Sequence, residues 1–198
     1  MIWVLILGFM QHSLGGTTTS LTEDQLAEKL HQYQSITSLE ASFKQTKTIK
    51  DMAIEIKSEG RFSLTRPRQV KWEIIKPSPV VILLNDKEMT IRTGKEKDLR
   101  TQTLKYDEMP SDKVARSMTG LMAWLDLNAK DLYRQYEVFP DGPKQFKFVP
   151  REKASPSFRS LNMTLSNSGH VEEVHIVENS GDFIDITFGI PKIVTNNK

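Results

Sequence analysis

Short runs of alternating apolar and polar residues recur along most of the chain, and Gly, Pro or Asn stands at the bends between them. The runs RFSLT (61–65), VKWEI (70–74) and FIDITF (183–188) have the period of two that is typical of strands with one buried face. The runs are not interleaved with helices as βα units would be. The pattern therefore predicts several short strands in an antiparallel sheet.

A helix is predicted ahead of the first strand. Thr22 is placed as its N-cap, with Gln25 completing a capping box and Leu21 stapling onto the first apolar turn. Helical spacing then gives this segment a single apolar stripe to bury, formed by Leu26, Leu30 and Tyr33.

A second helical region is predicted from Ser111, a candidate N-cap, and AKDLYRQY (129–136) is expected to add a turn or two. Its two methionines have two interpretations: ordinary core packing, or an adaptable surface for variable apolar ligands. A strongly curved antiparallel sheet covered on one face by these helices would bury every stripe. The stripe of the second region comprises Val114, Met118, Leu121, Met122 and Leu125.

Composition narrows the functional classes. The chain has 198 residues, a length that suits one domain, and a net charge of +2 with 26% charged residues, which does not favour nucleic-acid binding. Cysteine is absent, which excludes disulfides, zinc thiolates, thiol catalysis and a lipid-modified N-terminal cysteine.

The N-terminal residues have the character of a secretory signal. The apolar run from Ile2 to Met10 is too short to span a bilayer, and Ser13-Leu14-Gly15 offers a small-x-small cleavage site, although no Lys or Arg precedes the run. We therefore predict a signal peptide over residues 1–16, export to an extracytoplasmic space, and a single domain over residues 17–198.

The segment LTRPRQ contains the most informative polar residue. Alternation places Arg66 on the same face as Phe62 and Leu64, while Arg68 is expected in the turn after Pro67. A guanidinium on an apolar face needs acceptors, such as the free carbonyls at a helix C-terminus; the alternative is that Arg66 extends into solvent. Beyond the turn, the next apolar face comprises Val70, Trp72 and Ile74.

The sequence gives little support for catalysis or a metal. In HVEEVH, His170 and His175 would point to opposite faces of a strand, and their spacing is not the helical His-Glu-x-x-His arrangement. There is no Gly-rich phosphate loop and no nucleophile elbow. We expect no cofactor, no metal and no enzyme activity.

Several spaced segments resemble the periplasmic outer-membrane lipoprotein carriers, the LolA-like family. They are SLEASFKQ (38–45), GRFSLTRPRQVKWEIIKP (60–77), VILLNDKEMTI (81–91) and DLYRQYEVFPDGPKQFKFVPRE (131–152). In the second of these, a Gly, an Arg-Pro pair, a Trp and a further Pro occur in the family's order and spacing. The resemblance covers roughly residues 22 to 190.

The resemblance implies an open, incomplete β-barrel with a lid of helices over an apolar cavity. It implies that Arg66 faces inward and holds the lid closed, and that Trp72 lies on the inner face. Val70 stands where members carry Phe, and Thr90 and Arg92 replace aromatics. The final Phe-x-Phe and Pro-Gly segment of typical members is absent. The expected cavity residues are Phe43, Phe62, Leu64, Val70, Trp72, Ile74, Met118, Leu121, Met122 and Leu125.

The function implied by the resemblance is transport. Such a protein is a monomeric carrier that binds the acyl chains of lipoproteins and shuttles them across the periplasm, from a releasing transporter in the inner membrane to a receptor in the outer membrane. Two alternatives are open at this stage: a carrier for another lipid or glycolipid of the envelope, and an interaction module of the same fold that carries nothing.

Overall fold

The computed structural model describes residues 19–67, 69–94, 96–108, 124, 127–151 and 158–195. The predicted signal peptide, Arg68, and the predicted helix from Ser111 with its stripe residues Val114, Met118, Leu121, Met122 and Leu125 lie outside these ranges. Within the described part of the chain, no helix is long and apolar enough to cross a membrane.

Twelve strands form one sheet in the described residues, in the order β6-β5-β4-β3-β2-β1-β11-β10-β9-β8-β7, with β12 also pairing with β1. Every strand pair is antiparallel. The strands are β1 (Ile36–Ile49), β2 (Ile54–Thr65), β3 (Gln69–Lys76), β4 (Val80–Leu84), β5 (Glu88–Thr93), β6 (Arg100–Lys105), β7 (Tyr136–Pro140), β8 (Gln145–Pro150), β9 (Phe158–Leu165), β10 (Val171–Glu178), β11 (Phe183–Phe188) and β12 (Lys192–Thr195).

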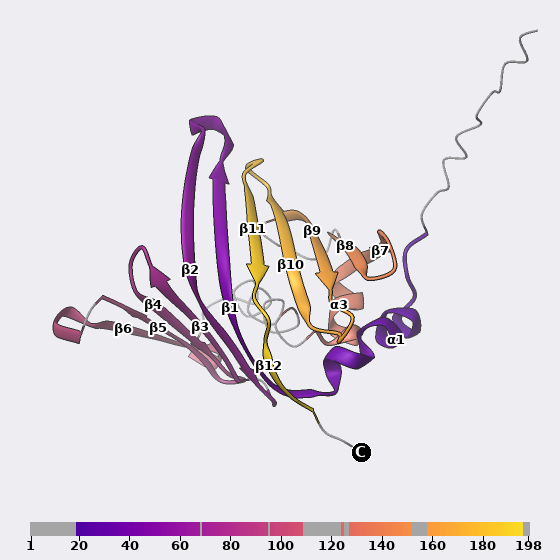
Figure 1. Cartoon of the computed structure of the whole chain (residues 1–198), viewed down its shortest axis with the longest axis horizontal. Helices are drawn as coiled ribbons and strands as arrows, with labels where there is room; N and C mark the ends of the chain where they lie inside the picture. The colour runs from indigo at the N-terminus through magenta and orange to yellow at the C-terminus, as the bar shows by residue number, and fades with distance from the viewer. Residues whose placement is uncertain are drawn as a thin grey trace, which may run out of the picture.

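The sheet is strongly curved and does not close on itself (Figure 1). Strands β3 to β6 splay to one side of the long β1–β2 hairpin, and β7 to β11 lie on the other side. The predicted open, curved antiparallel sheet is therefore confirmed. The first hairpin differs from the prediction of short strands, because β1 has 14 residues and β2 has 12.

The first helix, α1 (Glu23–Gln34), begins as predicted. Thr22 accepts from the backbone of Gln25, and the Gln25 side chain accepts from the backbone of Thr22, so both halves of the capping box are present. The predicted stripe is buried, and the backbone N–H of Leu21 donates to the carbonyl of Val138 in β7 at 2.7 Å. These contacts fix the start of α1 against the β7 side of the sheet.

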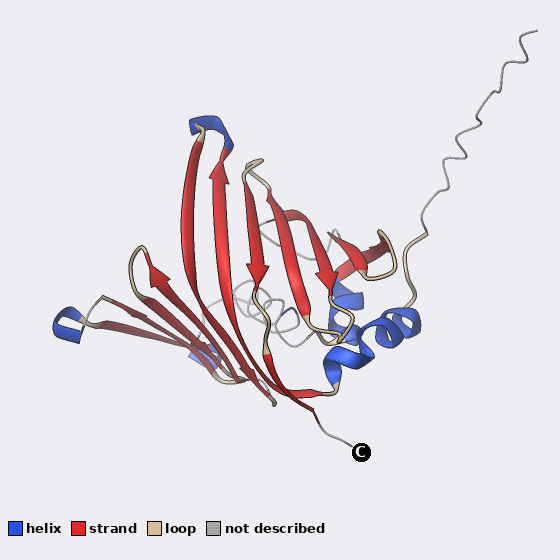
Figure 2. Ribbon diagram, viewed as in Figure 1, coloured by secondary structure: helices blue, strands red, loops and turns tan. Residues whose placement is uncertain are grey.

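The second described helix, α3 (Ala129–Gln135), is capped by Asn128, whose side chain accepts from the backbone N–H of Asp131. It buries Ala129 and Leu132, packs against α1, and leads directly into β7. Figure 2 shows both helices gathered at the β7–β9 side of the sheet. Short 3₁₀ turns cover residues Lys50–Met52, Glu96–Asp98 and Tyr106–Glu108.

Candidate functional site

One face of the sheet is apolar across most of its strands. Directly opposed residues of an antiparallel pair point to the same face, so the register traces rows of side chains across neighbouring strands. We call the face that carries Trp72 the inner face and the opposite one the outer face. Three rows of the inner face are Leu39-Leu64-Val70-Leu84-Met89, Ala41-Phe62-Trp72-Ile82-Ile91 and Phe188-Phe43-Gly60-Ile74-Val80.

An aromatic cluster occupies the middle of the inner face. The rings of Phe43 and Trp72 lie 4.2 Å apart between centroids, and Phe62 meets Trp72 at 5.6 Å in an edge-on arrangement. Phe188 joins the cluster from β11, 5.7 Å from Phe62 and 6.0 Å from Trp72. These separations are those of favourable aromatic pairs.

The structure brings together the six described cavity candidates. Phe43, Phe62, Leu64 and Val70 are buried, while Trp72 and Ile74 are partly buried and pack against the same core. Sequence reasoning missed Phe188 and the apolar residues that share its face on β10 and β11, which are Val174, Ile176, Ile184 and Ile186. The alternation in FIDITF already contained the signal, because Ile184, Ile186 and Phe188 share one parity.

Thr90 and Arg92 are not part of the inner face. Register places Thr90 opposite Leu83 and Arg92 opposite Val81, both on the outer face, whereas Ile91 lies opposite Ile82. The inner residues of β5 are therefore Met89 and Ile91. The replacement of aromatics at positions 90 and 92 therefore changes the outer face and leaves the inner face unaltered.

Arg66 lies at the end of β2, where it reaches the C-terminus of α1. Its Nε donates to the carbonyl of Ile36 at 2.7 Å, and its Nη2 donates to the carbonyl of Tyr33 at 3.4 Å. The guanidinium carbon lies 5.5 Å from the centroid of the Tyr33 ring, which adds a cation–π contact. The predicted pairing with carbonyls at a helix end is therefore observed, in place of the alternative in which Arg66 extends into solvent.

Burial shapes the ionisation of this pair. It raises the pKa of Tyr33 to about 12, although the nearby Arg66 charge acts in the opposite direction, so the phenol stays neutral. Burial also lowers the pKa of Arg66 from its ordinary value, while Tyr33 acts to raise it. A guanidinium remains charged in proteins, so Arg66 places a half-buried cation against the Tyr33 carbonyl in the last turn of α1 and the Ile36 carbonyl of β1.

A second set of contacts holds the segment that precedes α3. Trp124 packs its ring against Phe148 at 4.4 Å and Tyr136 at 4.9 Å. The side-chain amide of Gln34, at the end of α1, donates to the carbonyl of Leu127 at 3.3 Å. Leu127 is thus linked to α1, and Trp124 is packed against the β7–β8 part of the sheet.

The histidines of HVEEVH have separate local partners. His170 lies just before β10, where its Nδ1 is 2.8 Å from Ser166 Oγ and 3.0 Å from Ser168 Oγ. His175 lies on the outer face and pairs with Asp185 at 2.6 Å. The described residues contain no group of three or more His, Cys, Asp or Glu side chains that could hold a metal ion.

A family model for the outer membrane lipoprotein carrier protein LolA matches residues 34–197. The chain belongs to the LolA family. The outer-membrane lipoprotein carrier protein of Serratia proteamaculans (strain 568) is 25% identical over 167 residues, which is 84% of this chain and 77% of that protein. Members of the LolA family are carrier proteins, and the resemblance inferred from the sequence motifs is confirmed.

Two solved structures are similar at low sequence identity. A LolA superfamily protein from Nitrosomonas europaea is 10% identical, with 88% of this chain and 94% of that chain covered and a TM-score of 0.45. The lipoprotein LppX of Mycobacterium tuberculosis is 8% identical, with 85% and 95% covered and a TM-score of 0.43.

Proposed function

We propose that this LolA-family protein is a periplasmic carrier that binds the acyl chains of lipoproteins on the inner face of its sheet and delivers them from the inner to the outer membrane. The observation that carries the proposal is the continuous apolar inner face, centred on the Phe43, Phe62, Trp72 and Phe188 rings. The partners proposed for the carrier are an inner-membrane transporter that releases lipoproteins and an outer-membrane receptor.

The mechanism is binding without covalent chemistry. Burial of each acyl CH₂ contributes about 0.8 kcal/mol, so a chain of ordinary length gains far more than a few polar contacts cost to break. Arg66 acts as the latch of the empty carrier, because it joins the end of β2 to the Tyr33 carbonyl in the last turn of α1 as well as to the Ile36 carbonyl at the start of β1. Hydrogen bonds to a charged group contribute about 1.5 to 3 kcal/mol each, enough to favour the closed form and little enough to yield to lipid.

The cavity is formed between the inner face and the helices, with Phe43, Phe62, Leu64, Val70, Trp72 and Ile74 contributing from the sheet. Met118, Leu121, Met122 and Leu125, which lie outside the described residues, are proposed to complete the cavity on the basis of their sequence spacing. The histidines take no part in chemistry, and no metal or cofactor is required.

Cargo identification tests the proposal directly. The protein is purified from its native envelope without detergent, extracted with organic solvent, and the extract and the intact complex are analysed by mass spectrometry. Acylated lipoproteins are the expected cargo. Free phospholipid or glycolipid instead would indicate a carrier of another class, and a protein that is always empty would contradict a carrier function.

A transfer assay tests the latch. Arg66→Leu should load cargo but release it to an acceptor membrane more slowly than the parent, because the closed empty form is no longer favoured. Arg151→Leu is a matched control, since Arg151 makes similar contacts at the end of α3: its Nε donates to the Tyr133 carbonyl at 3.1 Å, and its guanidinium lies 5.2 Å from the Tyr133 ring centroid. Equal release by parent and Arg66→Leu would rule out the latch while leaving the cargo result intact.

A further inference from the structure

The protruding end of the β1–β2 hairpin has an open backbone edge. Strand β3 pairs with β2 only from Glu59 to Thr65, so residues 54–58 of β2 pair with β1 on one side and with no strand of the described residues on the other. Figure 1 shows this part of the hairpin rising beyond the neighbouring strands. Edges of this kind present unpaired N–H and C=O groups and accept another strand.

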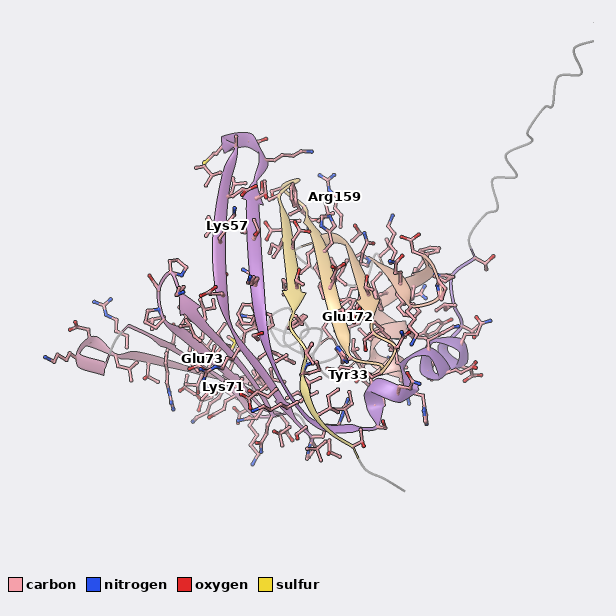
Figure 3. All side chains as sticks on the ribbon, in the orientation of Figure 1. Tyr33, Lys57, Lys71, Glu73, Arg159 and Glu172 are labelled. Carbon is pink, nitrogen blue, oxygen red and sulfur yellow. The ribbon has the colours of Figure 1, made fainter. Side chains whose placement is uncertain are left out.

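The side chains of this edge differ between its two faces. Ile54 and Ile56 point to the inner face and are 45% and 46% exposed, although isoleucine is normally buried. Glu55 and Lys57 point to the outer face, where they form an ion pair at 3.1 Å with side chains 55% and 73% exposed. Figure 3 labels Lys57 on this upper part of β2.

The edge sequence Ile-Glu-Ile-Lys-Ser is complementary to itself in one antiparallel register. If Ile56 lies opposite Ile56 of a second copy, each Glu55 lies opposite a Lys57 and each Ile54 lies opposite a Ser58. Opposed charges and apolar pairs are the cross-strand contacts that stabilise sheets. The self-complementary register uses all five residues of the open edge.

The neighbouring registers are disfavoured by charge. A shift that centres the pairing on Glu55 places two glutamates opposite each other, and a shift that centres it on Lys57 opposes two lysines. Like charges directly opposed across strands are destabilising. The two-fold register centred on Ile56 is therefore favoured twice. Its own Glu–Lys pairs attract each other, and the two neighbouring registers place like charges opposite each other.

We propose that residues 54–58 of β2 form a symmetric edge-to-edge contact with a second copy of this chain. The two-fold axis lies perpendicular to the sheet and passes beside Ile56, so the two sheets become continuous and their inner faces open to the same side. Five residues from each chain bury far less than the roughly 1,200 Å² of a stable complex. The dimer is accordingly weak, forming at high local concentration, while the dilute protein is a monomer.

Charge exchange at the edge tests the register. Glu55→Lys and Lys57→Glu should each weaken self-association by about tenfold, since either change opposes like charges at two positions. An equimolar mixture of the two variants should form a heterodimer, and the double variant Glu55→Lys/Lys57→Glu should restore self-association. Sedimentation velocity over a concentration series measures all five samples, with far-UV circular dichroism checking their folding.

Cysteine cross-linking provides a second measurement, because the chain has no cysteine of its own. Opposed residues of an antiparallel pair have Cα atoms about 4.5 to 5.5 Å apart, a span that a disulfide bridges. Ile56→Cys should therefore form a covalent dimer under mild oxidation. Ile54→Cys is the matched control, because its two copies would lie about 13 Å apart along the strands.

Three results would overturn the proposal. The first is a protein that stays monomeric up to millimolar concentration, with no heterodimer in the mixture. The second is Ile54→Cys cross-linking as fast as Ile56→Cys, which would contradict the register. The third is binding of Ile54 and Ile56 to phospholipid vesicles without self-association, which would identify the exposed edge as a membrane contact.

Discussion

Arg66 lies over the aromatic ring of Tyr33, with its guanidinium carbon 5.5 Å from the ring centroid, while its Nη2 donates to the carbonyl oxygen of the same tyrosine. Because Tyr33 is in the last turn of α1, one side chain at the end of β2 both stacks on the helix and donates to a carbonyl at its C-terminus. Arg151 and Tyr133 repeat the arrangement at the end of α3. Each described helix is thus tied by an arginine beside a proline.

Replacement of Arg66 by Lys should lower the free energy of unfolding. Lysine keeps the charge, but its three donors radiate from one nitrogen on a flexible stem, so it cannot reach the two carbonyls from separate nitrogens while stacking on Tyr33 as a planar guanidinium does. We expect a loss of about 1 to 3 kcal/mol, measured by urea unfolding. Arg61→Lys, at an exposed position on β2, should change stability little. Equal losses in the two variants would show that the Arg66 geometry is not stabilising.

Gly60→Ala should destabilise the centre of the inner face. A Cβ at this position would lie 1.8 Å from the Glu73 carbonyl oxygen and 2.9 Å from a ring carbon of Phe43, so the strand or the aromatic ring must move. We expect the free energy of unfolding to fall by about 2 kcal/mol or more and the fluorescence of Trp72 to shift. In Gly181→Ala nothing lies within 4 Å of the added Cβ, and only the strain of a positive φ remains. The free energy of unfolding should therefore fall more in Gly60→Ala than in Gly181→Ala.

Acid should weaken the turn that joins β9 and β10. Burial lowers the pKa of His170 below its ordinary value of 6.5. The neutral ring fits its surroundings, because Ser166 Oγ already accepts from the backbone N–H groups of Ser168 and His170, and its own proton is available to His170 Nδ1 or to Ser168 Oγ.

The sign of the pH effect follows from proton uptake. As pH falls below 6.5, the unfolded chain binds a proton at this ring before the folded chain does, so stability present above pH 6.5 is lost as pH falls through the folded pKa. His170→Gln lacks the titrating ring. Between pH 8 and pH 5, urea unfolding should show a steeper decline for the parent than for the variant, and parallel curves would contradict the prediction.

The local signals of the fold were readable from the sequence, whereas several strand positions were not. The capping box at Thr22 depends on neighbours within one element, and it is confirmed. Strand β6 was missed because RTQTLK has one apolar residue and lies at the edge of the sheet. The four-residue strand β12 was missed as well, since it is held by pairing with β1 instead of a pattern of its own.

Which side chains of neighbouring strands share a face depends on the register between those strands. A register shift between Glu59 and Gly60 inserts Ile75 as an extra residue in β3, and no composition rule predicts where such a bulge occurs. The alternation in EMTIRT (88–93) separates Thr90 from Met89 and Ile91, and the pairing of β5 with β4 then places Thr90 on the outer face. Alternation along one strand can be read from its own sequence. Matching the faces of two neighbouring strands requires knowledge of how their residues pair.

Phe188→Ala should weaken lipid binding, although sequence reasoning did not single out this residue. Its ring completes the aromatic cluster with Phe62 and Trp72 on the inner face. Phe183 has the same chemistry on the same strand but points to the outer face, where it contacts His175. Phe183→Ala is therefore a control for the general cost of removing an aromatic residue from β11.

Binding is measured by titrating each variant with a fluorescent acylated peptide. Loss of a phenyl ring that contacts an acyl chain removes roughly 1.5 to 3 kcal/mol of apolar burial, which corresponds to a dissociation constant about 10 to 100 times higher. Phe183→Ala should stay close to the parent. If both variants bound equally well, acyl chains would not contact the centre of the inner face, and the site would have to be sought elsewhere on the sheet. If both were weakened equally, the loss would reflect general destabilisation of β11, so urea unfolding of the two variants accompanies the titration.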